Sequence, residues 1–427
     1  MAEASPRQDV LSFMRRPVAD AAPDAFEALA LRVFAWQYAH NEPYAAFCRR
    51  RGRTPDRVEH WTAIPAVPTQ AFKALPLVTA GGPGKAAGEA AGEAAGEAAG
   101  EAAIFRTSGT TRGMERRGQH HVSDPALYHA SLLPTFAAYL LPDQARLPMC
   151  SLVPPSAEVP DSSLAHMVDQ VMAVFGAPGG GSYVDGAGRL EGAALEARLA
   201  EHEAAGTPVC LLGTSVALLR WLEVLDAAGR SFALPAGSRL MDTGGYKGSE
   251  REVSEAALRS AYGRLLGLPA DHCVNEYGMT ELLSQYYDDV LRRRVLGGGG
   301  RPAGIAEGAR VGSPGGTPGA RAGGRGAGPA EGAPAASSEG PRPKAGPPWL
   351  RALAADPDTL APLPPGEEGI LRHVDLANLG SVAAVQTEDV GVVLADGRIL
   401  LKGRLPGAEP RGCSRAMDQL LDAERTR

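Results

Sequence analysis

Three short polar segments of the sequence carry residue types suited to binding a nucleotide and a metal ion. The first, the signature loop, reads Thr107-Ser108-Gly109-Thr110-Thr111-Arg112-Gly113. Its backbone N–H groups and hydroxyls can converge on phosphate oxygens, and its glycines permit the backbone conformations that such an anion site needs. A Ser/Thr/Gly loop by itself is also typical of a polar hairpin turn or a helix cap. The loop therefore indicates phosphate chemistry only together with the other two segments.

Those two segments supply a metal ligand and groups for a nucleoside. They read Asn275-Glu276-Tyr277-Gly278-Met279-Thr280-Glu281 and Thr387-Glu388-Asp389. Glu281 offers the hard oxygen that Mg²⁺ prefers when it bridges to substrate phosphates. Tyr277 offers a flat face for a base, Thr280 a further hydroxyl, and Asp389 a carboxylate that could accept from both hydroxyls of a ribose. Taken singly, Tyr277 is as typical of a protein core, and each acid of a helix cap or a turn.

Taken in this order, the segments resemble those of the adenylate-forming enzymes, and within them the LuxE-type acyl-protein synthetases. The signature loop is similar to the superfamily loop Thr-Ser-Gly-Thr-Thr-Gly, with Arg112 inserted before the last glycine. Tyr277–Glu281 is similar to the superfamily motif Tyr-Gly-x-Thr-Glu. Asp389 falls where the family has its ribose-binding Asp, and Gly403-Arg404 where it has an Arg that contacts ribose or phosphate.

Further segments look like the LuxE-type branch. They are Thr243–Gly248 on the adenine side, Ile64–Pro68 followed by Phe72-Lys73, and the ending Gly407–Ser414. The resemblance runs from about residue 20 to the C-terminus, interrupted only by two low-complexity segments.

The resemblance implies ATP and Mg²⁺ as cofactors, with Glu281 as the metal ligand. The residues it implies in nucleotide binding are Thr107, Ser108, Gly109, Thr110, Thr111, Gly113, Gly244, Gly245, Tyr277, Gly278, Thr280, Asp389 and Arg404.

The resemblance also implies a two-step ligase reaction, that of an AMP-forming long-chain fatty acid–protein ligase. A carboxylic acid attacks the α-phosphate of ATP to give an acyl-adenylate and pyrophosphate. The loop that includes Thr107, a cationic side chain and Mg²⁺ mostly position the reactants and neutralise charge. The acyl group, a fatty acid by family analogy, then passes to a thiol of the protein, which delivers it to a reductase or carrier partner. Cys413 matches that cysteine, and Arg411 and Arg415 would favour its thiolate. An inert small hydrophobe is the alternative for Cys413.

Two departures from the larger adenylate-forming enzymes concern the C-terminal end. Only 23 residues follow Arg404, so the usual C-terminal domain of about a hundred residues with its catalytic Lys is not expected. Pro406 stands where those enzymes have a hinge Asp. Lys402 or Lys247 could supply the charge at the phosphate, or each could be a solvated surface lysine. The short end is shared with LuxE-type proteins and disfavours a coenzyme A ligase of the phenylacetate type.

Two other classes of function stay open. Gly213-Thr214-Ser215-Val216-Ala217 follows an apolar strand, as a hydrolase nucleophile does, and Asp242 with His272 or His373 would complete a triad in chain order. A helix N-cap is the structural alternative for that turn. A non-enzymatic binding module on an adenylation fold is the other class.

Composition bounds the remaining possibilities. The net charge of −6 gives no electrostatic reason to expect nucleic-acid binding, and no apolar run reaches the length of a membrane span. The N-terminus lacks a signal-peptide pattern. Five scattered cysteines without a CxxC pair disfavour a disulfide framework or a zinc site. These features predict a cytoplasmic protein without a membrane span.

Alternating elements predict an α/β class with a largely parallel sheet. Helical periodicity covers Phe26–Arg50, Pro125–Leu141, Leu164–Phe175, Ala193–Ala205, Val216–Ala228 and Glu252–Leu265. Strands are predicted at Leu147–Val153, Val209–Leu212, Arg239–Met241 and Cys273–Asn275, and after the second low-complexity segment at Gly369–His373, Val382–Gln386, Gly391–Leu394 and Arg398–Lys402. The Asp396-Gly397 turn is typical of a hairpin between the last two.

The resemblance implies the fold of the N-terminal domain of an adenylate-forming enzyme, with layered α/β sheets and a small β-rich C-terminal lobe. We expect a helical N-terminal part (1–78), a low-complexity insertion of Ala-Ala-Gly-Glu repeats (79–103), an α/β nucleotide-binding core (104–296), a disordered Gly/Pro-rich insertion (297–348) and the β-rich lobe (349–427).

Overall fold

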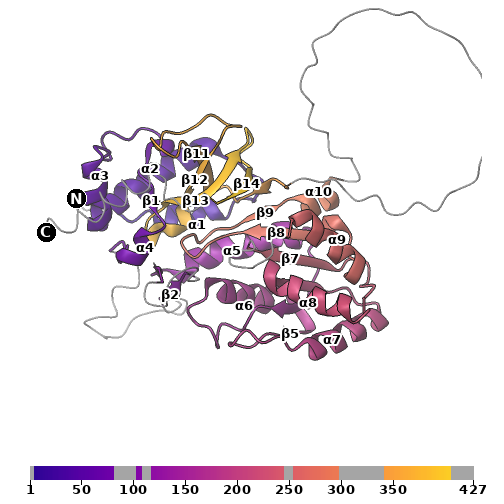
Figure 1. Ribbon diagram of the computed structural model, residues 1–427. Coiled ribbons are helices and arrows are strands. Elements are labelled where there is room, and N and C mark those ends of the chain that lie inside the picture. The colour runs from indigo at the N-terminus through magenta and orange to yellow at the C-terminus, as the bar shows by residue number, and fades with distance from the viewer. Residues whose placement is uncertain (1–3, 81–101, 108–116, 245–252, 298–340, 405–427) are drawn as a thin grey trace, which may run out of the picture.

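The computed structural model describes residues 4–80, 102–107, 117–244, 253–297 and 341–404, which form a mixed α/β structure. Its strands are β1 (Val67–Pro68), β2 (Ala103–Arg106), β3 (Gln119–Val122), β4 (Leu147–Leu152), β5 (Gly176–Ser182), β6 (Cys210–Thr214), β7 (Arg239–Thr243), β8 (Cys273–Tyr277), β9 (Tyr286–Asp288), β10 (Lys344–Ala345), β11 (Leu350–Ala355), β12 (Glu368–Asp375), β13 (Ala384–Val393) and β14 (Ile399–Arg404). One sheet of 12 strands runs in the order β11-β12-β13-β14-β10-β9-β8-β7-β6-β4-β5, with β1 beside β13, while β2 and β3 pair separately (Figure 1). The expected α/β class is confirmed.

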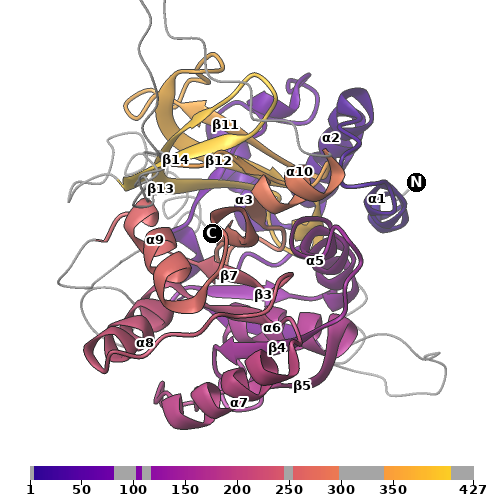
Figure 2. The same cartoon turned by 90° about the vertical axis from the view of Figure 1, so that its right-hand side faces the viewer.

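The helices lie before, between and after these strands. They are α1 (Arg7–Met14), α2 (Pro23–His40), α3 (Glu42–Arg50), α4 (Ala71–Ala74), α5 (Pro125–Leu140), α6 (Ser163–Phe175), α7 (Gly192–Ala205), α8 (Ser215–Ala227), α9 (Glu255–Leu266) and α10 (Val290–Leu296), with short 3-10 turns at Trp61–Ala63, Ala270–His272 and Leu376–Gly380. Figure 2 shows α1 and α2 beside β11–β14 at one end, and α7, α8 and β5 at the other.

The half of the sheet from β5 to β8 is parallel and covered on both faces. Since side chains alternate along a strand, neighbouring residues pack into different clusters. Met149, Leu212 and Met241 pack with apolar residues of α5 and α6. Leu211 and Leu240 pack with residues of α7, α8 and α9. Because both faces of these strands pack against apolar helices, their sequences are continuous apolar runs.

Three helices of this half begin at a hydroxyl cap. Ser162, Thr214 and Ser254 precede α6, α8 and α9, and each accepts a hydrogen bond from the backbone N–H three residues later. Such caps satisfy N–H groups that the first turn leaves unpaired. Asn41 does the same for α3, accepting from the N–H of Tyr44 at 3.2 Å. The predicted helix Phe26–Arg50 is therefore wrong as a single element: it is two helices, divided at Asn41.

The C-terminal strands are antiparallel and continue the same sheet. The predicted strands Val382–Gln386 and Gly391–Leu394 overlap a single strand, β13, which runs from Ala384 to Val393. β10 lies between β9, which runs antiparallel to β8 at the edge of the parallel half, and β14 of the antiparallel half. Two residues of β10 thus join the halves.

β10 also corrects a predicted boundary. The Gly/Pro-rich insertion was expected to run to residue 348, yet Lys344 is 1% exposed within β10 and Arg342 is buried beside it. Composition suggested solvation, but both cations have buried polar partners on β8 and β9. The first insertion has corrected ends too, since Thr79 is buried and Ala103 begins β2. Residues 81–101 and 298–340 lie outside the described residues.

The sequence analysis missed β5, whose residues read Gly-Ala-Pro-Gly-Gly-Gly-Ser. Glycine normally weakens a strand, but here it permits close approach to a neighbouring backbone. A Cβ on Gly180 would lie 2.3 Å from the carbonyl oxygen of Met149. The low intrinsic strand propensity of glycine therefore gives the wrong prediction for this segment.

Among the described residues, no helix combines the length and the apolar character that crossing a bilayer requires. The four cysteines in the described part of the chain (Cys48, Cys150, Cys210 and Cys273) are buried and free.

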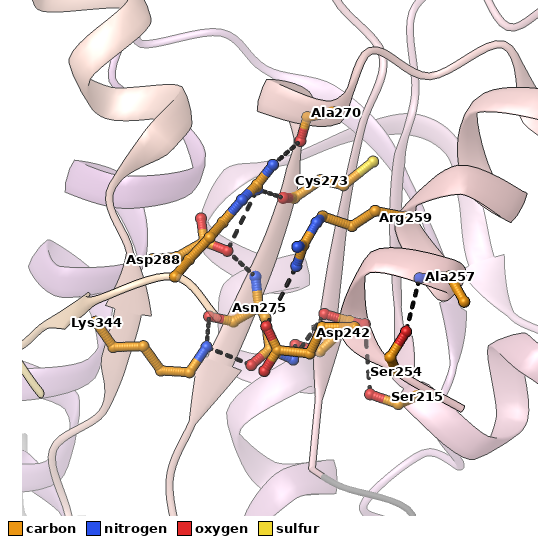
Figure 3. A network of polar contacts seen from close by, with 12 residues as sticks. Ser215, Asp242, Ser254, Ala257, Arg259, Ala270, Cys273, Asn275, Asp288 and Lys344 are labelled. Atoms are coloured by element: carbon orange, nitrogen blue, oxygen red, sulfur yellow. Dashed lines mark hydrogen bonds and ion pairs between the residues drawn. The ribbon is translucent and has the colours of Figure 1, made fainter. Parts of the chain in front are cut away.

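The ammonium of Lys344 lies in a buried polar network at the junction of the two halves (Figure 3). It donates to the side-chain oxygen of Asn275, whose amide nitrogen donates to Asp242 at 2.8 Å. The backbone N–H of Asn275 donates to Asp288 at 2.9 Å. Burial raises the pKa values of both aspartates, and the charge of Lys344 opposes that rise. Lys344 thus provides positive charge to carboxylates that are shielded from water.

Replacing this charge is expected to cost folding stability. Lys344→Met keeps a long apolar stem but leaves the buried carboxylates short of a counter-charge, at a cost of about 3 kcal/mol. Urea denaturation at pH 7 measures it, with Lys402→Met on exposed β14 as the matched control. The loss should shrink at low pH, where the carboxyl groups take up protons. Equal stability of the two variants would contradict the assigned role of Lys344.

Candidate active site

Three of the predicted nucleotide-binding residues meet across the sheet. Tyr277 ends β8, Asp389 lies in β13 and Arg404 ends β14. The phenol of Tyr277 donates to Oδ2 of Asp389 at 2.8 Å, and Nε of Arg404 donates to Oδ1 at 2.9 Å. Burial, followed by the charge of Asp389, raises the pKa of Tyr277, so the phenol keeps its proton and remains the donor. A carboxylate has about four acceptor positions, so Asp389 retains capacity for ribose hydroxyls.

A β-bulge aims Arg404 at this carboxylate. Val390 pairs with Gly403 and Gly391 with Leu401, so Lys402 is an extra residue in the ladder. Gly403 adopts φ +136°, which other residues rarely do. The bulge resets the alternation, and Arg404 then stands opposite Asp389. Lys402 itself is exposed on β14, and the structure does not bring it to the carboxylate.

The segment after the Ile64–Pro68 motif supports the same strand. β1 runs parallel to β13, with Val67 opposite Val385. Two residues beyond β1, the amide of Gln70 donates to Glu388, which also lies 3.9 Å from Arg404. This N-terminal motif therefore holds the strand that carries Asp389.

The signature loop joins the two strands of the small sheet. Thr107 and Gly118 close it, with the N–H of Thr107 donating to the Gly118 carbonyl and the N–H of Gly118 donating to Oγ1 of Thr107, both at 2.9 Å. Nε of Arg117 donates to the Thr107 carbonyl at 2.8 Å, and its guanidinium pairs with Asp161 at 3.2 Å. Arg117 thus braces the base of the loop.

Thr280 is held on two sides next to the predicted metal ligand. Its carbonyl oxygen lies 2.7 Å from Nδ1 of His120, and its hydroxyl 3.5 Å from that of Ser163. The carbonyl oxygen of Glu281 accepts from the side chain of Asn378 at 2.8 Å. Glu281 is 8% exposed. Two polar side chains, of His120 and Asn378, thus bind the backbone of Thr280 and Glu281.

Glu276 is a buried acid that the sequence analysis did not single out. It is 3% exposed, and its Oε2 accepts from the hydroxyl of Thr243 at the end of β7. Burial raises its pKa to about 7, although the Thr243 hydrogen bond and the charge of Lys344 oppose the rise. A Cβ on Gly278 would lie 2.4 Å from Oε1 of Glu276, so any other residue there would displace this carboxyl group. Glu276 thus lies between the adenine-side segment and the Tyr277–Glu281 motif.

Ser215 holds the start of the adenine-side segment. Its hydroxyl has three acceptors in reach: the Gly244 carbonyl at 3.0 Å, Asp242 at 3.3 Å and the Thr243 carbonyl at 3.4 Å. No imidazole binds Ser215 in the described part of the chain, where His272 pairs with Asp271 and His373 with Tyr286. The geometry therefore does not form the hydrolase triad that the sequence left open. Thr214 is the N-cap of that turn.

Several predicted residues lie outside the described residues. They are Ser108, Gly109, Thr110, Thr111, Gly113, Gly245 and Cys413, together with Lys247 and Pro406.

A magnesium ion would have one protein carboxylate in the described site. Among the described residues, no group of three or more His, Cys, Asp or Glu side chains is close enough to hold a metal ion. Magnesium usually takes one or two carboxylates plus substrate phosphates.

The chain resembles curated proteins over short stretches. No family model matches it. It is 30% identical over 89 residues to a long-chain-fatty-acid–luciferin-component ligase of Vibrio harveyi, covering 18% of this chain and 22% of that protein. A protein of the same name from Aliivibrio fischeri is 43% identical over 47 residues, covering 11% and 12%. The resemblance to LuxE-type ligases is thereby confirmed, over a small part of those relatives' length.

Solved structures of adenylate-forming enzymes are also similar. ATP-bound MatB from Rhodopseudomonas palustris has a TM-score of 0.42 at 15% identity, covering 70% of this chain and 47% of that chain. A long-chain-fatty-acid-CoA ligase from Archaeoglobus fulgidus has a TM-score of 0.42 at 12% identity, covering 71% and 51%.

The raised pKa of Glu276 predicts a pH-dependent stability. Between pH 4.5 and about 7 the unfolded chain loses this proton while the folded protein keeps it, so the free energy of unfolding falls as pH rises, then levels off. Glu276→Gln removes this contribution. Relative to the parent, the variant should therefore gain roughly 1–3 kcal/mol in stability between pH 4 and pH 8.

Urea midpoints measured at several pH values test this, with Glu368→Gln on the exposed start of β12 as the control. A stability difference between Glu276→Gln and the parent that stays constant with pH would contradict the buried, proton-holding state of Glu276.

Proposed function

We propose that this chain is an ATP-dependent ligase that activates a carboxylic acid as an acyl-adenylate. The contact of Tyr277 and Arg404 with Asp389 carries the proposal, because it joins residues 112 and 15 positions apart at one carboxylate. The motif resemblance independently implies that these same three residues bind the nucleotide. The names of the relatives from Vibrio harveyi and Aliivibrio fischeri support a fatty acid as substrate.

In the first step, a carboxylate oxygen of the acid attacks the α-phosphorus of ATP, and the bond to the leaving pyrophosphate breaks. Asp389 would receive the ribose hydroxyls, and Tyr277 would flank the base. The hydroxyls and N–H groups of the signature loop would bind phosphate oxygens, with Thr280 on the opposite side. Most of the catalysis in such a step is positioning and charge neutralisation.

Magnesium would be held by Glu281 and by the nucleotide phosphates. When bound, the ion neutralises charge on the phosphate oxygens. The side chains around Glu281 keep its backbone in place. Lys402, exposed two residues before Arg404, is a candidate for further positive charge at the phosphates.

In the second step, the thiolate of Cys413 attacks the acyl carbonyl carbon, and AMP leaves as a thioester forms. The other cysteines support this choice by their settings. Burial raises the pKa of Cys48 and of Cys210 to about 12 and that of Cys150 to about 11, and Cys273 is raised as well. Four thiols that stay protonated and buried are poor nucleophiles. Cys413 lies between two arginines in the sequence and would pass its acyl group to a reductase or carrier protein.

The ligase proposal also includes a domain organisation. We propose one catalytic body with an insertion before the signature loop and a second one before β10. The shared sheet from β5 to β11 supports a single body.

ATP–pyrophosphate exchange with a panel of carboxylic acids tests the first step. Asp389→Asn should raise the KM for ATP about 10-fold or more, because a charge-assisted hydrogen bond contributes about 1.5–3 kcal/mol. Asp396→Asn, in the exposed turn of the same hairpin, is the matched control and should match the parent. No exchange by the parent protein with any acid would refute the adenylation proposal. An unchanged KM in Asp389→Asn would refute the role of Asp389 alone.

Labelling with radioactive acid and ATP tests the second step. The parent protein should retain label that hydroxylamine releases, whereas Cys413→Ser should keep the exchange activity and retain no label. Peptide mapping of the labelled parent identifies the residue that holds the acyl group. Label retained equally by Cys413→Ser contradicts the assignment, and acyl-CoA made by that variant from added coenzyme A favours the coenzyme A ligase alternative.

A further inference from the structure

The strands that carry the signature loop are not part of the large sheet. β2 and β3 pair only with each other among the described strands. Polar contacts hold them at one side to Asp161, whose carbonyl oxygen accepts from the N–H of Arg106 at 2.8 Å and whose carboxylate pairs with Arg117. At the other side, His120 of β3 reaches the backbone of Thr280. Something must fix this hairpin relative to the Tyr277–Glu281 motif if both are to contact the same phosphates.

His120 has the properties of a fixed link. It is 1% exposed, and burial lowers its pKa to about 4, so the ring is neutral near pH 7. A carbonyl oxygen only accepts, so Nδ1 carries the proton and donates to Thr280 at 2.7 Å. The ring of Phe72 lies edge-on at 5.6 Å between centroids. One tautomer and one ring position are therefore set.

The burial of the His120 ring costs folding free energy, because its other ring nitrogen lacks a hydrogen bond. Nε2 of His120 is buried without a hydrogen-bond partner among the described residues. An unsatisfied buried polar atom costs about 1–3 kcal/mol. An apolar residue would avoid this cost but could not donate to Thr280. A histidine at position 120 is thus explained by the hydrogen bond that its Nδ1 donates to Thr280, and not by packing.

We propose that His120 is a positioning residue that sets the distance between the β2–β3 hairpin and the Thr280–Glu281 backbone. This inference rests on the proposed adenylation, in which both segments bind the phosphates. A link of this kind acts on geometry, since displacement of reacting groups by about 1 Å can cost 100-fold in rate. Ser163, at the start of α6, assists from the far side through the hydroxyl of Thr280.

Two substitutions separate the donor from the ring. Asn places an amide N–H near the position of Nδ1, whereas Gln places one near Nε2. His120→Asn should retain kcat within about threefold of the parent, because the donor to Thr280 is kept. His120→Gln should lose 10-fold or more in kcat for ATP–pyrophosphate exchange, with a smaller change in KM for ATP. His121→Gln, the next residue on β3 and half-buried, is the control and should match the parent.

Hydrogen exchange tests the link without any assay of activity. In His120→Gln the amides of β2 and β3 should exchange at least 10-fold faster, while those of β6 and β7 stay unchanged. In His120→Asn the hairpin should keep its protection. Should His120→Gln not fold, His120→Asn carries the test alone, and a 10-fold loss of kcat in that folded variant overturns the proposal.

The two measurements distinguish the two claims. A parent protein without exchange activity refutes adenylation, while the hydrogen-exchange result still decides whether His120 fixes the hairpin. Unchanged hairpin protection and unchanged kcat in His120→Gln overturn the role of His120 and leave adenylation standing. Loss of protection throughout the sheet in His120→Gln would show a general folding role and also overturn the proposal.

Discussion

The hydrogen bond from the buried ammonium of Lys344 to Asn275 is the interaction that links the two halves of the sheet. Charged groups enter a protein interior only when they are paired and hydrogen-bonded. Lys344 meets this condition through Asn275, which in turn binds Asp242 and Asp288. Asp242 also accepts from Ser215, whose hydroxyl reaches the carbonyl of Gly244. The join between the two halves of the sheet and the start of the adenine-side segment therefore belong to one polar network.

The sequence predicted those helices and strands that form because of the pattern of residues within their own segment. The amphipathic helices α5 to α9 and the apolar strands β4, β6, β7 and β8 follow from residue periodicity, and the structure places them within a few residues of the predicted bounds. Tyr277, Asp389 and Arg404 were found through motif resemblance, although 112 residues separate the first two. Periodicity could not have found that contact, because nothing in either segment alone specifies its partner.

The features that were missed have distant causes. Lys344 read as part of a solvated insertion because its partner Asn275 lies 69 residues earlier. The sequence could not show the role of His120, because its acceptor, Thr280, lies 160 residues away. The glycine-rich strand β5 was not predicted, because the close approach of Met149 cannot be seen in the sequence. In each case a long-range contact outweighs a local preference. A polar residue amid Gly and Pro, such as Lys344, is the only local signal available.

The two sides of the proposed nucleotide site have different mechanical support. Tyr277, Asp389 and Arg404 lie on strands of one sheet, so their spacing is set by backbone hydrogen bonds across β13 and β14 and by the network at β10. The signature loop instead belongs to a two-stranded sheet, and an isolated hairpin is only marginally stable. Its position comes from contacts outside its own two strands, among them the backbone hydrogen bond from Arg106 to Asp161, Arg117 on Asp161 and His120 on Thr280. The proposed nucleoside side therefore lies within one sheet, while the proposed phosphate side depends on contacts between separate elements. Single substitutions can loosen the phosphate side without unfolding the sheet.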